Sequence, residues 1–300
     1  MSIFQNERIK GAAYAFAGFS AFSIGDSVFK YLGAEYATLT IAFYASFFAF
    51  MTMLGVAVAR GGIRKHLASK HRKFHFLRGI LLLAQFLLIL HAFMNLSMAE
   101  TYALIFIAPF LTTIISIPLL KEKAQPEQWL AILIGLCGVL VILRPGMIPL
   151  ESGSLAALGA ALLFALANIT ARFIGTRDSV LSFGIYVQFI ITPGTFLLML
   201  MTGIEVPTWP HLALLAFAGI CGAGGIIFIA AGFAHAPAAI AAPFHYVQML
   251  WAILFGYLIF NDPLDLWVGA GATIIISSGL WLIYVEKARK RKHKQRLSTP

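Results

Sequence analysis

The chain has 300 residues, of which 60% are hydrophobic and only 11% are charged. A soluble globular protein carries about 25% charged residues, so this composition excludes that class and indicates an integral membrane protein. The formal net charge of +10 would suggest nucleic-acid binding in a soluble protein, but here its distribution along the chain indicates membrane topology.

Apolar segments of roughly 17 to 25 residues recur along the chain without the alternation of a β-strand. Lipid offers the backbone no hydrogen-bond partners, so such segments cross a bilayer as helices. The sequence therefore predicts an all-α integral membrane protein with ten transmembrane helices, the first of them an uncleaved N-terminal span. The expected spans are 11–31, 38–59, 77–97, 100–120, 128–144, 154–175, 180–203, 211–233, 238–260 and 266–285.

The positions of Lys and Arg predict the orientation. If both termini are cytoplasmic, 20 of the 22 cationic residues lie on the cytoplasmic side, mainly in the segment 60–78 and in the basic tail 287–300. Only Lys30 and Arg144 lie on the other side, together with six acidic residues. The positive-inside rule then predicts a multi-pass protein of the cytoplasmic (inner) membrane with cytoplasmic N- and C-termini.

The first span is similar to the sixth when the sequence is shifted by 142 residues. The matched pairs are Gly11 with Gly153, Phe22 with Phe164, Asp26 with Asn168, Lys30 with Arg172, and Gly33 with Gly175. Because each half holds five spans, an odd number, the second half enters the membrane from the opposite side. We expect two inverted repeats, at residues 8–146 and 152–286, followed by the cytoplasmic tail.

The segment 99–146 combines a small-residue entry, a proline break, a charged exit, a tryptophan-led helix with two glycines, and a stop. These features are Ala99, Pro109, Lys121-Glu122-Lys123, Trp129, Gly135, Gly138 and Arg144-Pro145-Gly146. The segment resembles the EamA domain of the drug/metabolite transporter superfamily, and the resemblance extends over residues 8–286, with Asn261 where the family usually has Glu. It implies ten helices in two inverted EamA repeats with a substrate cavity between them. Relatives move amino acids, nucleotide-like metabolites such as S-adenosylmethionine, or drugs.

Asp26 is an acidic residue inside the first span. Phe22, Asp26 and Lys30 follow one another at intervals of four residues and share one stripe of the helix. An ionisable group at this depth costs about 2.5 to 3.5 kcal/mol and faces the interior of a bundle rather than lipid. Two interpretations stay open: a structural Asp26–Lys30 ion pair, or a role of Asp26 in substrate recognition or proton coupling.

Polar residues in other spans are candidates for a substrate site. Span 9 holds the densest group, His245, Tyr246, Gln248 and Trp251, which is typical either of helix–helix hydrogen bonding or of a ligand cavity; we favour the cavity. The further candidates are His91 and Asn95 in span 3, Tyr102 and Phe106 in span 4, and Asn168 in span 6. His91 is expected at the depth of Asp26, either as a core histidine or as a second coupling residue.

Prolines interrupt two of these spans. Pro109 in span 4 and Pro243 in span 9 each remove a helix hydrogen bond and free a carbonyl, so they are candidate hinges. Cys137 and Cys221 both lie in apolar segments and are expected to be core residues without a disulfide.

The basic segments are expected to contact lipid. His66, His71 and His75 have a spacing that a metal site would allow, but the surrounding cations repel a metal ion. We expect no metal, and we expect segments 60–78 and 287–296 to lie on anionic headgroups. Nucleic acid is not expected as a partner, because these segments lack an aromatic stacking platform.

The sequence contains no catalytic motif and no nucleotide-binding loop, so we expect neither an enzyme nor a cofactor. Transport energy must then come from a gradient. The sequence predicts a secondary transporter or exporter of small metabolites, amino-acid-like or otherwise amphipathic, that works by alternating access. The alternatives are an uptake or exchange carrier for an adenosyl metabolite such as S-adenosylmethionine, and a passive channel or non-transporting scaffold. A homodimer stays open as the oligomeric state.

Overall fold

The computed structural model describes residues 2–67, 69–121, 125–144, 151–175, 178–236, 238–263 and 265–298. This part of the chain is helical, with no strand among its residues. Nine of its helical segments are long and apolar enough to cross a membrane, and they match nine of the ten predicted spans. The remaining span is α1 (Ser2–Leu32), whose glycines, serines, Asp26 and Lys30 reduce its hydropathy. The predicted all-α membrane class is confirmed.

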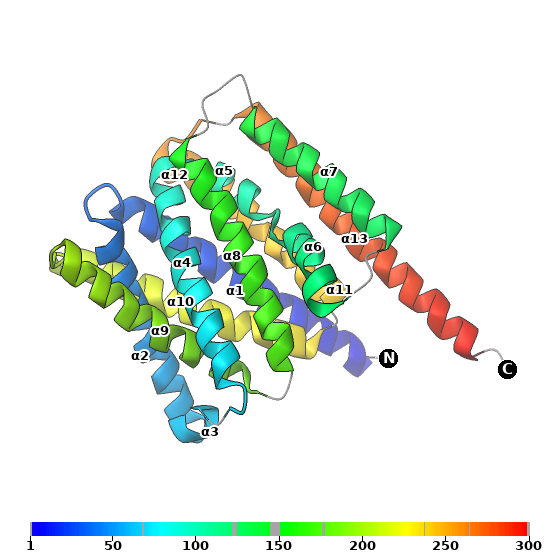
Figure 1. The fold of residues 1–300 in the computed structure, drawn as a ribbon, viewed down its shortest axis with the longest axis horizontal. Coiled ribbons are helices and arrows are strands. Elements are labelled where there is room, and N and C mark those ends of the chain that lie inside the picture. Colours follow the sequence, from blue (N-terminus) through cyan, green and yellow to red (C-terminus); the bar gives the residue numbers. More distant parts are fainter. Residues whose placement is uncertain are drawn as a thin grey trace.

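The helices follow one another through short connections (Figure 1). In chain order they are α1 (Ser2–Leu32), α2 (Thr38–Ala59), α3 (Ile63–Leu67), α4 (Arg72–Asn95), α5 (Met98–Ile105), α6 (Ala108–Leu120), α7 (Pro126–Leu143), α8 (Ser152–Ile174), α9 (Val180–Thr202), α10 (Trp209–His235), α11 (Ala238–Ala241), the 3-10 helix η2 (Ala242–Tyr246), α12 (Val247–Phe260) and α13 (Leu266–Ser298).

The bundle has two ends, which we name by the segments they carry. The terminal face holds the start of α1, the helix α3 and the α8–α9 connection. The far face holds the α1–α2, α4–α5, α9–α10 and α12–α13 connections. Hydrogen bonds join the connections within each face, for example from the backbone N–H of Ala37 to Glu205 on the far face and between His66 and Ser179 on the terminal face.

The most extensive helix contacts each join the first five spans to the last five. Helix α1 packs along α10, α4 packs along α8, and α7 packs along α13; the last pair lies side by side along one edge in Figure 1. In span numbers these pairs are 1 with 8, 3 with 6, and 5 with 10. Exchanging the two halves converts the first pair into the second and leaves the third unchanged. Two inverted copies related by an axis in the membrane plane produce this reciprocal pairing.

Glycines allow α1 and α10 to approach backbone to backbone. A Cβ added at Gly18 would lie 2.8 Å from the backbone nitrogen of Ile229, and one added at Gly232 would lie 2.9 Å from that of Ala15. Such close approach is the usual way in which helices associate in lipid, where the hydrophobic effect gives no preference for one apolar neighbour over another. These small residues therefore hold the two halves in contact.

Spans 4 and 9 are both interrupted in the middle. Span 4 breaks between α5 and α6, where Pro109 lies in the first turn of the second segment. Span 9 passes from α11 through η2, which contains Pro243, into α12. The two breaks occupy corresponding places in the two halves, and proline lacks the N–H that would continue each helix.

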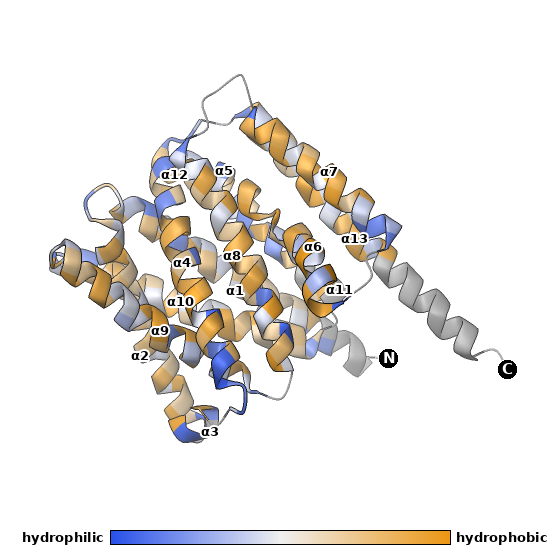
Figure 2. Ribbon diagram, in the orientation of Figure 1, coloured by the Kyte–Doolittle hydropathy of each residue, from blue (hydrophilic) through white to orange (hydrophobic). Residues whose placement is uncertain are grey.

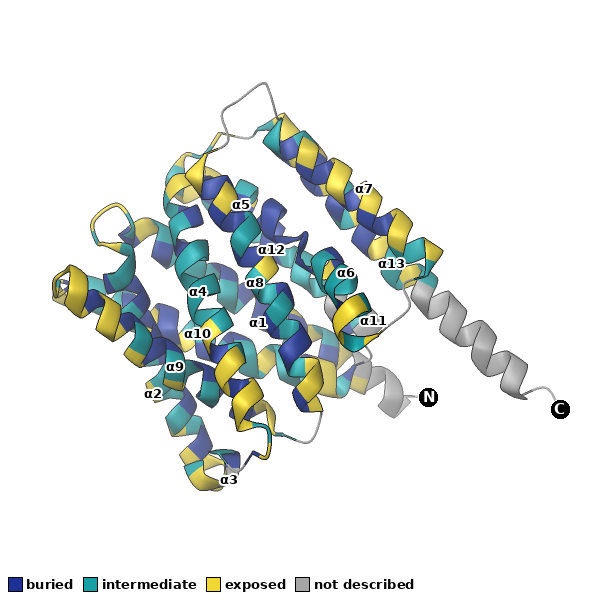
Figure 3. Cartoon of the chain, viewed as in Figure 1, coloured by how far each residue is buried: buried dark blue, intermediate teal, exposed yellow. Residues whose placement is uncertain are grey.

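Apolar residues cover the helices and polar residues gather at their ends, especially at α3 (Figure 2). Figure 3 shows exposed positions along the outer faces of the helices. Large apolar side chains are exposed, among them Leu133, Met201 and Leu254. An apolar exterior suits lipid rather than water. Cys221 is half-buried, but Cys137 is exposed on α7, so the expectation of two core cysteines is wrong for Cys137. The reason is that α7 packs mainly against α13 and leaves its other side uncovered.

The α1–α10 contact gives a direct test. We expect Gly232→Ala to lower the free energy of unfolding by about 1 to 3 kcal/mol, because the new methyl group overpacks a backbone contact. Gly222→Ala in the same helix is the matched control, since a Cβ there meets nothing within 4 Å. Thermal unfolding in detergent measures both variants; equal melting temperatures would contradict the contact.

Candidate functional site

A polar stripe on α1 faces α5 and α12 near the middle of the bundle. The Tyr102 hydroxyl on α5 donates a hydrogen bond of 2.5 Å to Asp26 Oδ2 and lies 3.4 Å from Ser23 Oγ. The side chain of Gln248, buried on α12, lies near the Tyr102 hydroxyl. In the described part of the chain, no Lys, Arg or His nitrogen forms an ion pair with Asp26. Asp26 is thus a half-buried carboxyl group whose partners are uncharged.

Aromatic rings surround this stripe. The His245 ring lies 5.0 Å from that of Phe19 and 5.1 Å from that of Phe106, measured between centroids. Tyr246 meets Phe106 edge to face at 5.3 Å, and Trp251 Nε1 donates to Ser20 Oγ at 2.8 Å. We call Phe19, Tyr102, Phe106, His245, Tyr246 and Trp251 the aromatic cluster. His245, Tyr246 and Trp251 are each half-buried.

The two helix breaks help to place these rings. Phe106 ends α5 at the break of span 4, and His245 and Tyr246 belong to η2 at the break of span 9. Interrupted spans in corresponding positions of two repeats are the usual place of a transporter's substrate site. The candidate site therefore combines one carboxyl group, several hydroxyl and amide groups, and aromatic faces, which suits a small amphipathic molecule with a ring.

The structure brings most of the predicted site residues together but separates three of them. His91 Nε2 on α4 lies 3.2 Å from Ser152 Oγ at the start of α8, and Asn95 Nδ2 donates to the His91 carbonyl at 2.7 Å. Asn168 is half-buried on α8, and none of the hydrogen bonds between described residues joins it to Asp26 or to the aromatic cluster. His91 and Asn95 lie along the α4–α8 contact instead.

The Asp26–Lys30 ion pair, one of the two interpretations that the sequence left open, is not formed, because Lys30 has another partner. Lys30 Nζ lies 2.8 and 3.0 Å from the two carboxylate oxygens of Asp262 and donates to the Leu96 carbonyl at 3.0 Å. We call this the far-face ion pair. Sequence reasoning missed Asp262, although it belongs to the acidic residues predicted at the same end of the bundle as Lys30.

A second polar group, on the terminal face, involves histidines that sequence reasoning assigned to a lipid-facing loop. His75 is fully buried, with Nε2 2.8 Å from Asp178 Oδ2, and Ser69 Oγ donates to the same oxygen at 2.5 Å. His66 Nδ1 lies 2.9 Å from Ser179 Oγ. The described residues contain no group of three or more His, Cys, Asp or Glu arranged to hold a metal ion. The group instead attaches the α3 segment to the α8–α9 connection.

The charge of Asp178 is favoured by these contacts. Partial burial alone would raise the pKa of this carboxyl, but the hydrogen bonds from Ser69 and His75 outweigh it, and the pKa is lowered below its usual value. The corresponding contact on the far face is looser. There His211 Nδ1 lies 3.4 Å from Glu35 Oε2, and the Glu35 side chain is 52% exposed.

Comparison with known proteins agrees with this architecture. The model of the EamA-like transporter family matches residues 9–144 and, a second time, residues 151–285. The chain is 29% identical over 274 residues to the S-adenosylmethionine uptake transporter of Rickettsia prowazekii (strain Madrid E), and the aligned region covers 91% of this chain and 92% of that protein. It is 28% identical over 300 residues to the riboflavin transporter of Vibrio cholerae serotype O1 (strain ATCC 39315 / El Tor Inaba N16961), with 98% and 99% covered.

A solved crystal structure has the same fold. It superposes with a TM-score of 0.65 over 93% of this chain and 98% of its own, at 15% sequence identity. At that level of identity the likeness concerns the fold alone.

The Asp178 contact predicts a pH dependence of stability. Because the folded-state pKa is lowered, the stabilisation is complete above the unfolded value of about 3.9 and is lost as the pH falls through the folded value. We expect Asp178→Asn to cost about 1 kcal/mol at neutral pH. The difference in melting temperature from the wild type should stay constant above about pH 5 and shrink below about pH 4.

Thermal unfolding in detergent across this pH range provides the measurement. Ser69→Ala removes one of the two donors and should retain a smaller difference of the same form. A wild-type advantage over Asp178→Asn that persists undiminished in acid would show that the carboxylate charge does not hold this connection.

Proposed function

This chain belongs to the EamA-like transporter family, and from that membership we propose that it is a secondary transporter that moves a small metabolite across the cytoplasmic membrane by alternating access. Its two repeats, residues 8–146 and 152–286, rock against each other around a central site. The reciprocal pairing of the halves and the two matched helix breaks support this mechanism. The sequence offers no nucleotide-binding loop, so a gradient supplies the energy.

Asp26 and the aromatic cluster form the substrate site in this proposal. The single observation that carries it is the environment of Asp26, a half-buried carboxyl group with uncharged partners. A lone carboxylate at membrane depth is unfavourable unless a positive charge or a proton compensates it. A cationic substrate group or a proton therefore occupies the site during transport. Gln248 and Ser23 contribute hydrogen bonds, and the rings of His245, Tyr246 and Trp251 stack on the substrate.

This chemistry favours a substrate that joins a flat ring to a positive group. S-adenosylmethionine meets both requirements, through its adenine ring and its sulfonium and ammonium groups, and it is the substrate named for one relative. Riboflavin, named for another relative, has a flat ring but no positive charge. We propose an adenosyl-type cation as the substrate, within the broader class of amino-acid-like and amphipathic solutes.

We propose that the terminal face is cytoplasmic, with both termini inside. Exposed cationic side chains, Arg64, Arg72 and Lys73, gather near α3 on this face, where anionic headgroups attract them. The same lipid contact is proposed for the tail 287–296, whose side chains lie outside the described residues. The six acidic residues predicted outside include Glu205, Asp262 and Asp265, which all lie at the far face.

Counterflow in proteoliposomes tests the function. Vesicles loaded with unlabelled S-adenosylmethionine should accumulate the labelled compound transiently, because a carrier exchanges one molecule for another. S-adenosylhomocysteine, which lacks the sulfonium charge, and riboflavin are the matched probes. Exchange of riboflavin alone would reassign the substrate. The absence of counterflow both with all three compounds and with a wider panel of amino acids would favour the passive channel or scaffold.

Asp26→Asn tests the central carboxyl group. We expect this variant to reduce exchange of a cationic substrate by at least about tenfold and to flatten its pH dependence between about pH 5 and 8, because neither charge nor proton exchange remains at this position. Tyr102→Phe keeps the carboxylate and should shift the pH profile without flattening it. An unchanged melting temperature serves as the folding control. A pH profile for Asp26→Asn that matches the wild type would remove Asp26 from coupling.

A further inference from the structure

The far-face ion pair connects α1 and the α4–α5 junction of the first repeat with the end of α12 in the second repeat. Lys30, on α1, contacts both carboxylate oxygens of Asp262, which follows α12. The same ammonium group donates to the Leu96 carbonyl at the end of α4 and lies 5.0 Å from the centroid of the Phe260 ring. Asp262 Oδ2 accepts the Met98 backbone N–H at 3.3 Å, at the start of α5. One pair of charges thus connects α1, the α4–α5 junction and the end of α12.

The backbone around Asp262 is shaped to present its carboxylate inward. Asn261 ends α12 in the left-handed conformation, with φ of 52°, which turns the chain back over the helix end. The Asp262 N–H then bonds to the Gly256 carbonyl at 2.8 Å, and a Cβ at Gly256 would lie 3.2 Å from Asp262 Oδ2. The carboxylate also lies at the N-terminus of α5, where the helix dipole favours a negative charge.

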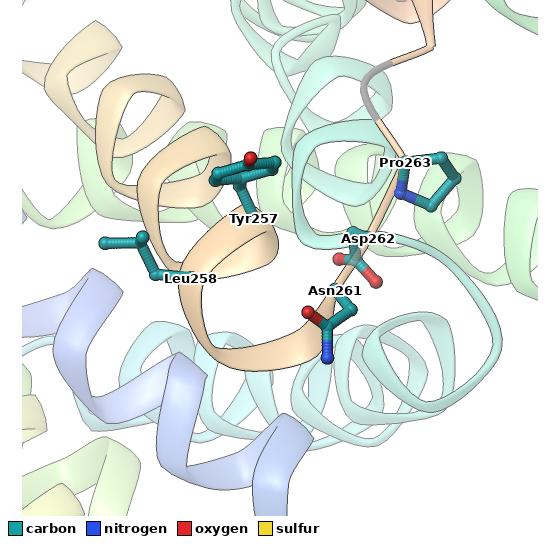
Figure 4. Close-up of a pocket in the computed structure, with 5 residues that line it drawn as sticks. All are labelled: Tyr257, Leu258, Asn261, Asp262 and Pro263. Atoms are coloured by element: carbon teal, nitrogen blue, oxygen red, sulfur yellow. The ribbon is translucent and has the colours of Figure 1, made fainter.

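The position of the pair places it between the candidate site and the far face. Lys30 follows Asp26 by one helical turn on the same stripe of α1. A pocket of about 530 Å³ opens at the end of α12. Tyr257, Leu258, Asn261, Asp262 and Pro263 line it, as Figure 4 shows. Asp262 therefore belongs both to this pocket and to the ion pair with Lys30.

We propose that Lys30 and Asp262 are the far-face gate of the transport path: the pair is intact while the site is closed to that face and separates when the site opens to it. The inference rests on the proposed transport function. The Lys30 and Asp262 side chains are 13% and 19% exposed, so each can regain water when the pair breaks. A fully buried pair lacks that compensation and seldom separates. Separation frees α1 from α12 and thereby lets the two repeats move apart at this end.

Another ion pair on the same face supplies a matched control. Arg144 Nη2 lies 2.7 Å from Asp265 Oδ2, and this contact joins the end of α7 to the start of α13 at the edge of the bundle. It also connects the two repeats, but it involves neither α1 nor α12. A gate role therefore distinguishes Asp262 from Asp265, whereas a general stabilising role does not.

Exchange measurements test the gate within the transport cycle. Lys30→Met and Asp262→Asn should each reduce counterflow by about tenfold, because a site that stays open to one face cannot alternate. Lys30→Arg, which keeps the positive charge, should retain most of the rate, and Asp265→Asn should keep the wild-type rate. Wild-type exchange in both single variants, or equal losses in Asp262→Asn and Asp265→Asn, would overturn the proposal.

Thiol accessibility tests the gate without transport. Ser23, Ser27 and Lys30 share a face of α1, and the Ser27 hydroxyl donates to the Ile24 carbonyl of its own helix. In a Cys137→Ser/Cys221→Ser background, Ser27→Cys should react slowly with a membrane-impermeant thiol reagent applied at the far face. Adding Asp262→Asn should accelerate the reaction about tenfold. Adding Asp265→Asn should not change it, and Lys30→Arg, which keeps the charge, should keep it slow.

The two measurements separate the possible failures. Equal reaction rates with and without Asp262→Asn would overturn the gate, whatever the exchange rates are. A wild-type protein that exchanges none of the probes but shows the accelerated reaction would contradict the proposed function while retaining controlled access at the far face. If Asp262→Asn fails to fold, Lys30→Met removes the other charge of the pair and still decides: slow modification of the Ser27→Cys thiol in the Lys30→Met variant would exclude the pair as the closing contact.

Discussion

Lipid cannot satisfy a charge or a hydrogen bond, and this constraint determines where every polar side chain of the bundle lies. Tyr102 donates a hydrogen bond to Asp26, and Lys30 donates to Asp262 and to the Leu96 carbonyl. His75 forms a hydrogen bond with Asp178. The contacts of Lys30 and His75 join one repeat to the other. Polar residues that would be unfavourable alone in lipid therefore act as connections between the halves, and Asp26, whose partners are uncharged, is the exception that marks the site.

The two repeats are alike in architecture and unlike in chemistry. Both have a span broken near a proline, and both place their first span against the third span of the other half. The side chains at matching places differ, since Asp26 corresponds to Asn168. The His75–Asp178 contact on the terminal face is buried, whereas the His211–Glu35 contact on the far face is longer and exposed. In the proposed transport cycle the repeated fold allows a symmetric motion, and the side chains that differ between the repeats make substrate recognition asymmetric.

Sequence reasoning predicted the spans, the repeat and the grouping of Asp26 with His245, Tyr246, Gln248 and Trp251, because hydropathy and helical spacing report burial directly. Sequence reasoning failed where the prediction depends on which neighbouring helix a side chain faces. His91 was placed with Asp26 by depth, but it lies on the α4–α8 contact. For Lys30, sequence reasoning considered only Asp26, the nearest acid on the same helix, as an ion-pair partner. The partner is Asp262, which comes close only through the packing of the second repeat. The burial of His66 and His75 was not predicted, because the many cationic residues of segment 60–78 indicated a loop on the lipid headgroups.

The close contact between α1 and α10 has a consequence for how the protein is made. Gly18 meets the backbone near Ile229, so about 200 residues must be synthesised before the first helix finds its main neighbour, on the order of 10 to 40 s at ordinary translation rates. During that interval α1 holds Asp26 and Lys30 without Asp262, which has not left the ribosome. Asp26 can meet Tyr102 and Lys30 can meet the Leu96 carbonyl within the first repeat, but Lys30 stays without its carboxylate partner until the second repeat has been synthesised.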